Sequence, residues 1–256
     1  MKKHLLIQSL VLALPVLALT STASANDINT ELKSIYVPVH RVMMSEDGRY
    51  FLELKSGIWN PSARLHDQVL NQDYQLSGLQ KGNAIELKGS NAEQPDLQLK
   101  GELNSKLGSM SSQLLLDGWQ RKIHFQPLIY VENRPTFNFK FYGHNLIQRV
   151  DVLQRSNQQL YQSLVGFNAD ASQMQYIDLN FDGYFDLALK AATVVENENE
   201  QNYLYWMYNP KTAQFQRAAA LEKLQGTPYV DAVKQEVHFG TQRFKVKNGL
   251  LHAVTD

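Results

Sequence analysis

The residues best suited to chemistry lie in one stretch, 176–189, which reads YIDLNFDGYFDLAL. It contains the pattern D-x-N-x-D-G-x-x-D, whose oxygen donors are Asp178, Asn180, Asp182, Tyr184 and Asp186. Ca²⁺ takes about six to eight oxygen ligands, and a tight loop with oxygens at alternate positions can surround one ion. We therefore predict a structural Ca²⁺ site in which these five residues are the ligands, Tyr184 through its main-chain carbonyl.

The surrounding residues distinguish this loop from an EF-hand. Gly183 permits the sharp turn, but Leu189 stands where an EF-hand places a bidentate Glu on a helix. Both Met174–Asp178 and Phe185–Ala192 alternate as strands do, so the ion would join two strands. The segment resembles the calcium loops of integrin-type FG-GAP repeats. The alternative is an Asx-rich turn without a metal, because Asp, Asn and Gly also favour turns.

Residues 1–25 have the three parts of a secretory signal peptide. They begin with Lys2 and Lys3, continue with an apolar run, and end in Ala-Ser-Ala at Ala25. We expect cleavage after Ala25 and export to the periplasm of a two-membrane bacterium. The chain has no cysteine, so we expect no lipid anchor, and no later segment is apolar enough to span a bilayer.

The charge balance argues against a nucleic-acid partner. The chain has 25 basic and 25 acidic residues, and without residues 1–25 the balance is 23 basic to 25 acidic. Nucleic-acid binding needs a concentrated basic face, which this composition does not indicate. A chain of this length can build a core without disulfides.

Short segments of alternating apolar and polar residues predict an all-β fold. We expect an antiparallel meander, sandwich or propeller-like arrangement with few short helices. The expected strands are Ile35–Val42, Arg49–Leu54, Ala84–Lys88, Leu97–Leu103, Gln113–Asp117, Lys122–Val131, Thr136–Tyr142 and Gln148–Leu153. The expected helices are Ser62–Asn71 and Gln216–Leu224.

A loose repeat and a polar link suggest two domains. Within residues 74–132, three alternating segments close on Gly78, Gly89 and Gly101, as in successive hairpins of a meander. The link ENRP then precedes further strands. We predict an N-terminal β-rich domain over 26–132 and a C-terminal β-domain with the calcium loop over 133–256.

An acidic segment is the first place to look for a partner-binding loop. ENENEQN, residues 196–202, carries Glu196, Glu198 and Glu200. It reads as a solvated hairpin loop, and a sharper reading makes it a protrusion that enters a basic partner's cleft. A second loop is expected at Gly166–Gln173.

The following segment, YLYWMYNPKT, is apolar on both faces of a strand. Tyr203, Tyr205 and Met207 share one face, and the residues between them share the other. This pattern favours a central strand covered on both sides. The alternative is an exposed aromatic platform that stacks on sugar rings.

The common catalytic signatures are missing. The sequence has no cysteine nucleophile, no G-x-S-x-G, no H-E-x-x-H and no phosphate-binding loop, and its histidines are scattered singly. We therefore predict that the protein is not an enzyme, although paired carboxylates for glycoside hydrolysis stay open.

The C-terminal half resembles a known family. The DLNFDGYFDL segment and the later Tyr/Trp-rich strand that ends in NP and a Phe are similar to those of the calcium-binding periplasmic immunity proteins of bacteria-killing type IV secretion systems. That family is in turn similar to periplasmic lysozyme inhibitors. The resemblance covers about residues 146–224, and the family's lipid-anchoring cysteine is missing.

The resemblance implies a protein that binds and inhibits a peptidoglycan-cleaving effector, with Ca²⁺ as a structural ion. Two other classes stay open, a peptidoglycan- or carbohydrate-binding module and a hydrolase of an unrecognised kind. The inhibitor hypothesis ranks first, and it rests on the family resemblance.

Overall fold

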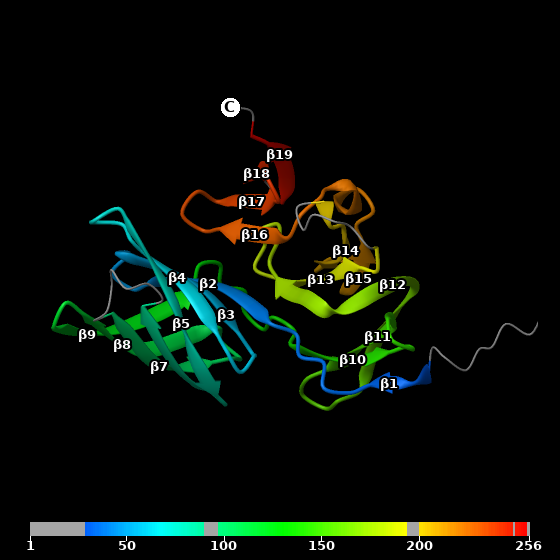
Figure 1. Ribbon diagram of the computed structural model, residues 1–256, viewed down its shortest axis with the longest axis horizontal. Helices are drawn as coiled ribbons and strands as arrows, with labels where there is room; N and C mark the ends of the chain where they lie inside the picture. The colour runs from blue at the N-terminus through cyan, green and yellow to red at the C-terminus, as the bar shows by residue number, and fades with distance from the viewer. Residues whose placement is uncertain (1–28, 90–96, 194–199, 248, 255–256) are drawn as a thin grey trace, which may run out of the picture.

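All the long elements in the described part of this protein are strands, so the predicted all-β class is confirmed (Figure 1). The computed structural model describes residues 29–89, 97–193, 200–247 and 249–254. In this part of the chain the strands form one large sheet with a closed section, antiparallel except for one parallel pairing, and one small sheet of four strands.

The N-terminal strands form a closed antiparallel barrel. Each pairs with the next in the chain, and the last also pairs with the first, Pro127 opposite Met43. An eight-stranded barrel is narrow enough for side chains to fill its interior, and here the core includes Met43, Leu52, Leu99 and Phe125. The barrel strands are β2 (Val39–Ser45), β3 (Tyr50–Ser56), β4 (Ser62–Asp67), β5 (Gln72–Lys81), β6 (Ala84–Gly89), β7 (Gln98–Asn104), β8 (Ser109–Leu116) and β9 (Trp119–Pro127).

The expected meander over residues 74–132 is present, but two of its glycines lie inside strands rather than at turns. A Cβ at Gly78 would lie 1.9 Å from the main-chain oxygen of Glu86 on β6. A Cβ at Gly101 would lie 2.5 Å from that of Ser111 on β8. The glycines therefore permit close approach of neighbouring strands in the strongly curved barrel wall.

The second half of the large sheet curls around its own core. Its antiparallel order is β1, β10, β11, β12, β13, β14 and β15, and β12 also touches β2 through Tyr176 and Val39. Aromatic side chains such as Phe137, Phe167 and Trp206 fill the core. The strands are β1 (Glu31–Leu32), β10 (Phe137–Tyr142), β11 (Ile147–Gln154), β12 (Leu160–Ile177), β13 (Asp186–Ala191), β14 (Tyr203–Asn209) and β15 (Gln214–Arg217).

The C-terminal residues form the small sheet, which packs against both larger units (Figure 1). Val237 and Phe239 lie in one cluster with Tyr205 of β14, and Val42 on the barrel packs against this cluster. The small sheet contains β16 (Pro228–Asp231), β17 (Glu236–Phe239), β18 (Gln242–Lys247) and β19 (Leu250–Ala253), and the 3₁₀ turn η3 (Leu221–Lys223) precedes it.

Strand β14 lies in the middle of this arrangement, as its two apolar faces predict. It pairs with β13 and β15, and it contains the first seven residues of the segment YLYWMYNPKT. Tyr203 and Tyr205 face the cluster shared with the small sheet, whereas Leu204 and Trp206 face the other core. The alternative of an exposed aromatic platform is wrong, because these four side chains are buried.

The two predicted helices are wrong. Ser62–Asp67 is strand β4, paired with β3 on one side and β5 on the other, so tertiary pairing overrides the local pattern. Most of the predicted Gln216–Leu224 helix is the end of β15 and an irregular link, and only the short turn η3 is helical. The predicted loop at Gly166–Gln173 lies within β12, whose register shifts between Ala169 and Met174.

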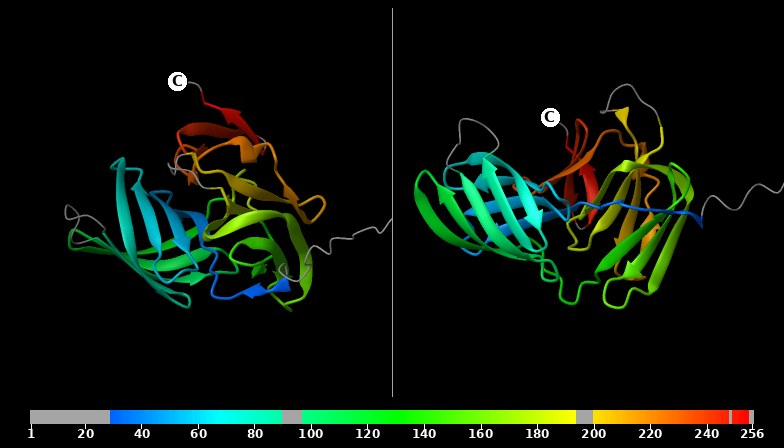
Figure 2. Two further views of the ribbon diagram at one scale, coloured as in Figure 1. Left: turned by 45° about the vertical axis from the view of Figure 1, so that its right-hand side comes forward. Right: turned by 60° about the horizontal axis from the view of Figure 1, so that its bottom comes forward.

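Two segments pass between the barrel and the second half. Residues 33–38 lead from β1 at the edge of the second half to β2 in the barrel, and residues 128–136 lead back to β10 (Figure 2). Ile35 and Val37 pack against the second core, although they precede the barrel strands. In the described residues no helix has the length and apolar character to cross a membrane.

A polar network joins the barrel to the small sheet. Glu53 on β3 accepts hydrogen bonds from the Tyr229 hydroxyl and from the Ala232 main-chain N–H, both at 2.7 Å. Arg64 on β4 bridges the two units, because it pairs with Glu53 at 2.7 Å and with Asp231 at 3.1 Å. The Arg64, Glu53 and Asp231 side chains are largely buried, so their mutual pairing compensates charges that have lost most of their water.

Candidate metal centre and the adjoining pocket

The predicted calcium ligands all lie at the hairpin that connects β12 to β13. Ile177 and Asp186 form the last pair of the ladder, and the other four predicted ligands lie between them. Phe181 and Gly183 have φ values of +49° and +83°, so the chain turns through the left-handed region twice. The glycine therefore occupies the position that needs positive φ, as the sequence pattern requires.

Asp186 ties this hairpin loop to the sheet. Its side chain is 0% exposed, and its two carboxylate oxygens accept hydrogen bonds from the main-chain N–H groups of Leu179, at 3.0 Å, and Tyr208, at 2.9 Å. Burial, followed by the nearby charge of Asp178, raises the pKa of Asp186 well above its ordinary value. Each oxygen keeps a second lone pair, so the residue can still ligate a cation.

The other two carboxylates accept hydrogen bonds from the loop itself. Asp178 accepts from the main-chain N–H groups of Asp182, at 3.2 Å, and Gly183, at 2.8 Å. Asp182 accepts from the Tyr184 main-chain N–H and from the Asn180 side-chain amide, both at 2.9 Å. This is the Asx-type bonding of the metal-free alternative. Among the residues that the structure describes, no three acidic, His or Cys side chains converge as a metal-binding group.

The donor set nevertheless fits Ca²⁺. The Asn180 Oδ1 atom is buried and has no hydrogen-bond partner, although Asn180 donates through its amide nitrogen. Burial, followed by the charge of Asp182, raises the pKa of Asp178 to about 7. The unpartnered oxygen would coordinate a hard divalent cation, and the positive charge of the ion would offset the repulsion among the carboxylates. Binding would require Asp178 and Asp182 to turn oxygens from the loop amides toward the ion.

Arg134, in the link between β9 and β10, contacts this loop from the barrel side. Its Nη1 atom donates to the Gly183 carbonyl oxygen at 3.0 Å, and its guanidinium lies 4.5 Å from the centre of the Phe185 ring. A Cβ at Gly183 would lie 2.4 Å from the Val131 side chain in the same link. Sequence reasoning treated this link only as a domain boundary, and no motif marks its contact with the loop.

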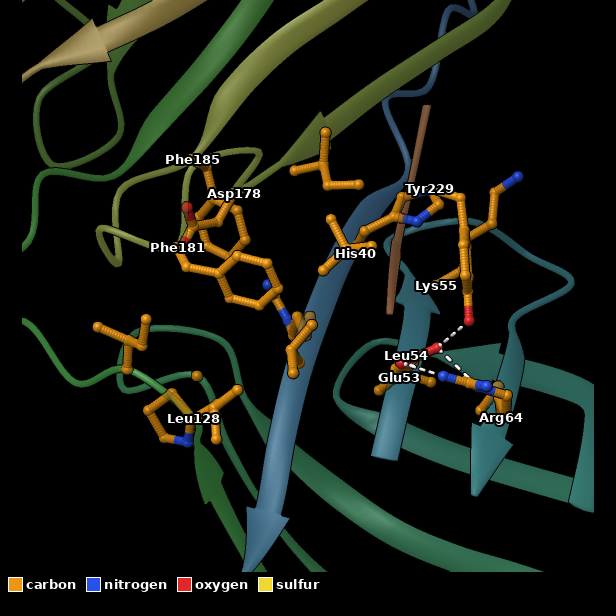
Figure 3. A pocket seen from close by; sticks show the side chains of 18 of the residues that line it. His40, Glu53, Leu54, Lys55, Arg64, Leu128, Asp178, Phe181, Phe185 and Tyr229 are labelled. Atoms are coloured by element: carbon orange, nitrogen blue, oxygen red, sulfur yellow. Dashed lines mark hydrogen bonds and ion pairs between the residues drawn. The ribbon is translucent and has the colours of Figure 1, made fainter. Parts of the chain in front are cut away.

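A pocket of about 390 Å³ adjoins the loop (Figure 3). Asp178, Phe181 and Phe185 line one side, while His40, Lys55 and Tyr229 come from the barrel and the small sheet. The Glu53 network lies along the same wall. This volume falls within the range of small-molecule sites, about 300–1,000 Å³.

Two basic side chains of the pocket have unpartnered nitrogens. The Nε2 atom of His40 is buried without a partner, and burial, with a smaller effect of Lys55, lowers the pKa of this residue to about 3. Arg41 is only 8% exposed, and its buried Nε atom also lacks a partner. Burial and the neighbouring Arg134 charge lower the pKa of Arg41 to about 10, which leaves it charged at neutral pH.

Of the three predicted partner-binding residues, the structure describes one, Glu200, which lies near the end of β13 that is away from the calcium loop. Glu196 and Glu198 lie outside the described residues, and Glu200 is exposed just before β14. β13 has six residues, so the two ends are separated by roughly 17 Å at about 3.3 Å per residue. The structure therefore does not bring Glu200 together with the predicted metal ligands.

Comparisons with known proteins leave the function open. No family model matches the chain, and no curated protein matches it. One solved structure is similar, that of a protein from Bacteroides uniformis named as a candidate 6-phosphogluconolactonase. The two chains are 11% identical, the match covers 83% of each, and the TM-score is 0.35. Such a TM-score supports no argument about fold or activity.

Proposed function

We propose that this protein is an exported, calcium-binding inhibitor of a peptidoglycan-cleaving, lysozyme-like effector, and so an immunity protein of the periplasm. It acts by binding and not by catalysis. The observation that carries the proposal is the loop 178–186, where three carboxylates and a buried, unpartnered Asn180 oxygen gather at one hairpin. The resemblance of this loop and of strand β14 to periplasmic immunity proteins supplies the target class.

In this proposal Ca²⁺ has a structural role. Asp186 already joins the loop to the main chain of β14 through Tyr208, and the ion would fix the remaining turn. The turn carries Phe181 and Phe185 at the pocket, so calcium would hold that face in one conformation. By mass action, Ca²⁺ at a hundred times its dissociation constant stabilises the folded state by about 2.7 kcal/mol.

Inhibition is tested with peptidoglycan hydrolysis. Lysozyme-type enzymes, and any cell-wall hydrolase encoded next to this gene, are assayed with and without residues 26–256, in calcium and in chelator. We expect stoichiometric inhibition of one of them, weaker in chelator. If every enzyme stays active at a tenfold molar excess of this protein, the inhibitor function is wrong.

The calcium site is tested separately by thermal unfolding. Asp182→Ala should remove the stabilisation that calcium gives the wild type, while in chelator it should cost only the loop hydrogen bonds, about 1 kcal/mol. The control is Asp47→Ala, which changes an exposed carboxylate on the β2–β3 turn of the barrel. If Asp182→Ala lowers the melting temperature equally in calcium and in chelator, the loop does not bind calcium.

The acidic hairpin is tested by reversing the charges of Glu196, Glu198 and Glu200. If this segment enters the effector's cleft, the triple Lys variant inhibits at least tenfold less well and keeps its calcium-dependent stability. Undiminished inhibition would exclude the hairpin and direct attention to the opposite end of β13.

The pocket gives one reason to retain the second class, a peptidoglycan- or carbohydrate-binding module. Its wall presents the aromatic rings of Phe181, Phe185 and Tyr229, and such rings can contact a sugar. Sedimentation of the protein with purified sacculi, without inhibition of any enzyme, would favour this class. Degradation of the sacculi would favour a hydrolase instead.

A further inference from the structure

Arg41 is a buried cation without a counter-ion. It shares a face of β2 with Met43, which belongs to the barrel core, and only 8% of the residue is exposed. Among the described residues, Arg41 forms no ion pair, and its buried Nε atom has no hydrogen-bond partner. Buried charges in proteins are normally paired, because the unpaired ion loses its water without compensation.

A second guanidinium of the same sign, that of Arg134, lies against the aromatic ring that Arg41 contacts. Arg41 lies 5.8 Å from the centre of the Phe185 ring, and Arg134 lies 4.5 Å from the centre of the same ring. Contact with an aromatic ring compensates a cation only in part. Arg134 has a hydrogen bond to the Gly183 carbonyl, but it has no carboxylate partner in the described chain.

The acids that line the same pocket are already engaged. Asp178 accepts hydrogen bonds from two loop amides, and Glu53 accepts from Arg64, Tyr229 and Ala232. Neither is recorded in an ion pair with Arg41. Arg41 therefore carries a positive charge that forms no ion pair with an acid of this pocket.

The cavity offers room and apolar contacts beside that charge. Arg41 and Arg134 both line it, together with the rings of Phe181 and Phe185. His40, whose Nε2 atom has no partner, also lines the cavity, and a neutral imidazole nitrogen can donate or accept one hydrogen bond. An anionic group with a flat apolar part would meet each of these surfaces.

We infer that this pocket binds a small organic anion. Its carboxylate or phosphate pairs with the Arg41 guanidinium, in the field of Arg134, and its apolar part lies against Phe181 and Phe185. Guanidinium groups suit this role because their planar N–H donors match both anions. The inference does not rest on inhibition of a hydrolase, since binding is measured on the protein alone.

The test is calorimetric titration of residues 26–256 with four anions and one cation. Benzoate and phenyl phosphate carry the apolar ring, acetate and inorganic phosphate carry only the charged group, and benzylammonium keeps the ring but reverses the charge. We expect an aromatic anion to bind at least tenfold more tightly than its ring-free counterpart, and benzylammonium not to bind. The stronger of benzoate and phenyl phosphate identifies the charged group.

The variant Arg41→Met separates a ligand-binding role from a structural one. Met has a similar volume and no charge, and replacement of an uncompensated buried ion by an apolar residue is neutral or stabilising. We expect this variant to keep or raise the melting temperature without ligand, and to bind the aromatic anion at least tenfold more weakly. The matched control is Arg121→Met, which changes an exposed arginine paired with Asp47 on the barrel and should leave anion binding unchanged.

Two results would overturn the inference. One is the absence of binding by all four anions at millimolar concentration, which would leave only water in the pocket. The other is a lower melting temperature of Arg41→Met together with unchanged anion binding, which would make Arg41 a structural residue and place the anion elsewhere. Because neither measurement uses an enzyme, both results are distinct from failure of the inhibitor proposal.

Discussion

At the scale of single residues, the hairpin loop holds two buried carboxyl groups, Asp178 and Asp186, whose pKa values are raised. Burial is the main reason why ionisation of Asp178 and Asp186 is disfavoured, and the charges of Asp182 on Asp178 and of Asp178 on Asp186 add to this effect. Without a cation the folded state holds protons that the unfolded chain releases. The loop therefore makes the stability of the folded state depend on pH.

The pH dependence gives a first prediction. The folded-state pKa of Asp178 is raised to about 7. In chelator, the contribution of this residue therefore lowers the free energy of unfolding as pH rises from about 4 to 7. His40 acts in the opposite direction below about pH 6.5, because its folded-state pKa is lowered. His40 is present in both the wild type and the Asp178→Asn variant, so its contribution cancels in the difference between their free energies of unfolding. Relative to the wild type, we expect this variant to gain about 2 kcal/mol of unfolding free energy between pH 5 and 7.5.

The measurement is denaturant unfolding in chelator at both pH values. Asp170→Asn on β12 is the control. The pKa of Asp170 is lowered, chiefly by the hydrogen bond from the Ser172 main-chain amide, so its contribution to the free energy of unfolding no longer changes with pH above about pH 5. In calcium we expect the variant to lose its advantage, because a bound cation favours the ionised wild-type carboxylate. A constant difference between Asp178→Asn and the wild type in chelator would contradict the burial of Asp178.

Two tyrosines on one face of β14 give a second prediction. The Tyr203 hydroxyl donates to Gln173 at 2.8 Å and lies 3.2 Å from the Thr227 hydroxyl, whereas the buried Tyr205 hydroxyl has no partner in the described chain. We expect Tyr203→Phe to lower the free energy of unfolding by about 1–2 kcal/mol and Tyr205→Phe to leave it equal or higher. Chemical denaturation of the two variants side by side checks this order, and equal losses would show that Tyr205 is hydrogen-bonded.

At the scale of elements, the hairpin of β12 and β13 is fixed by its contact with the link 128–136. Gly183 combines a φ of +83° with a Cβ position only 2.4 Å from Val131. The loop can approach the link only because this residue has no side chain. The turn residue that the calcium pattern demands thus also serves packing.

A third prediction compares two glycines with nearly the same φ. Gly166 on β12 has a φ of +84° and open space around its Cβ position. We expect Gly166→Ala to cost about 1 kcal/mol from backbone strain alone, and Gly183→Ala to cost at least about 2 kcal/mol more because the link must move. Thermal unfolding in chelator separates this effect from the metal. Similar costs for both variants would show that the link yields without strain.

At the scale of the whole molecule, the barrel, the curled second half and the small sheet meet around the pocket. The Glu53 network attaches the small sheet to the barrel, and the cluster around Tyr205 and Phe239 attaches it to the second half. The pocket therefore exists only in the assembled molecule, because its walls come from all three units.

The fourth prediction concerns this attachment. Glu53→Ala leaves the largely buried Arg64 with only Asp231 and the more distant Asp73, at 3.6 Å, and we expect a loss of about 2–4 kcal/mol. Glu86→Ala is the matched control, because the Glu86–Lys100 pair on the same barrel is exposed and should contribute little to stability. Limited proteolysis should cut the Glu53→Ala variant between β15 and β16 sooner than it cuts the Glu86→Ala variant. Equal stability of the two variants would contradict a role of the network.

The sequence by itself determined much of this protein, because local patterns carry the necessary information. Period-two alternation predicted the all-β class and most strands, and the two apolar faces of YLYWMYN predicted the covered strand β14. Five oxygen donors at fixed spacing placed the candidate calcium ligands in one hairpin. Spacing suffices there, since all five ligands lie within nine residues of each other.

Only the tertiary structure decided the features that depend on distant residues. Ser62–Asp67 became a strand because β3 and β5 offer hydrogen bonds on both sides, which its own pattern does not reveal. Closure of the barrel depends on pairing between β2 and β9, about 80 residues apart. The unpaired charge of Arg41 and its proximity to Arg134 arise because the link 128–136 returns to the start of β2. A sequence pattern records local spacing, whereas burial, pairing and neighbouring charge are set by the path of the whole chain.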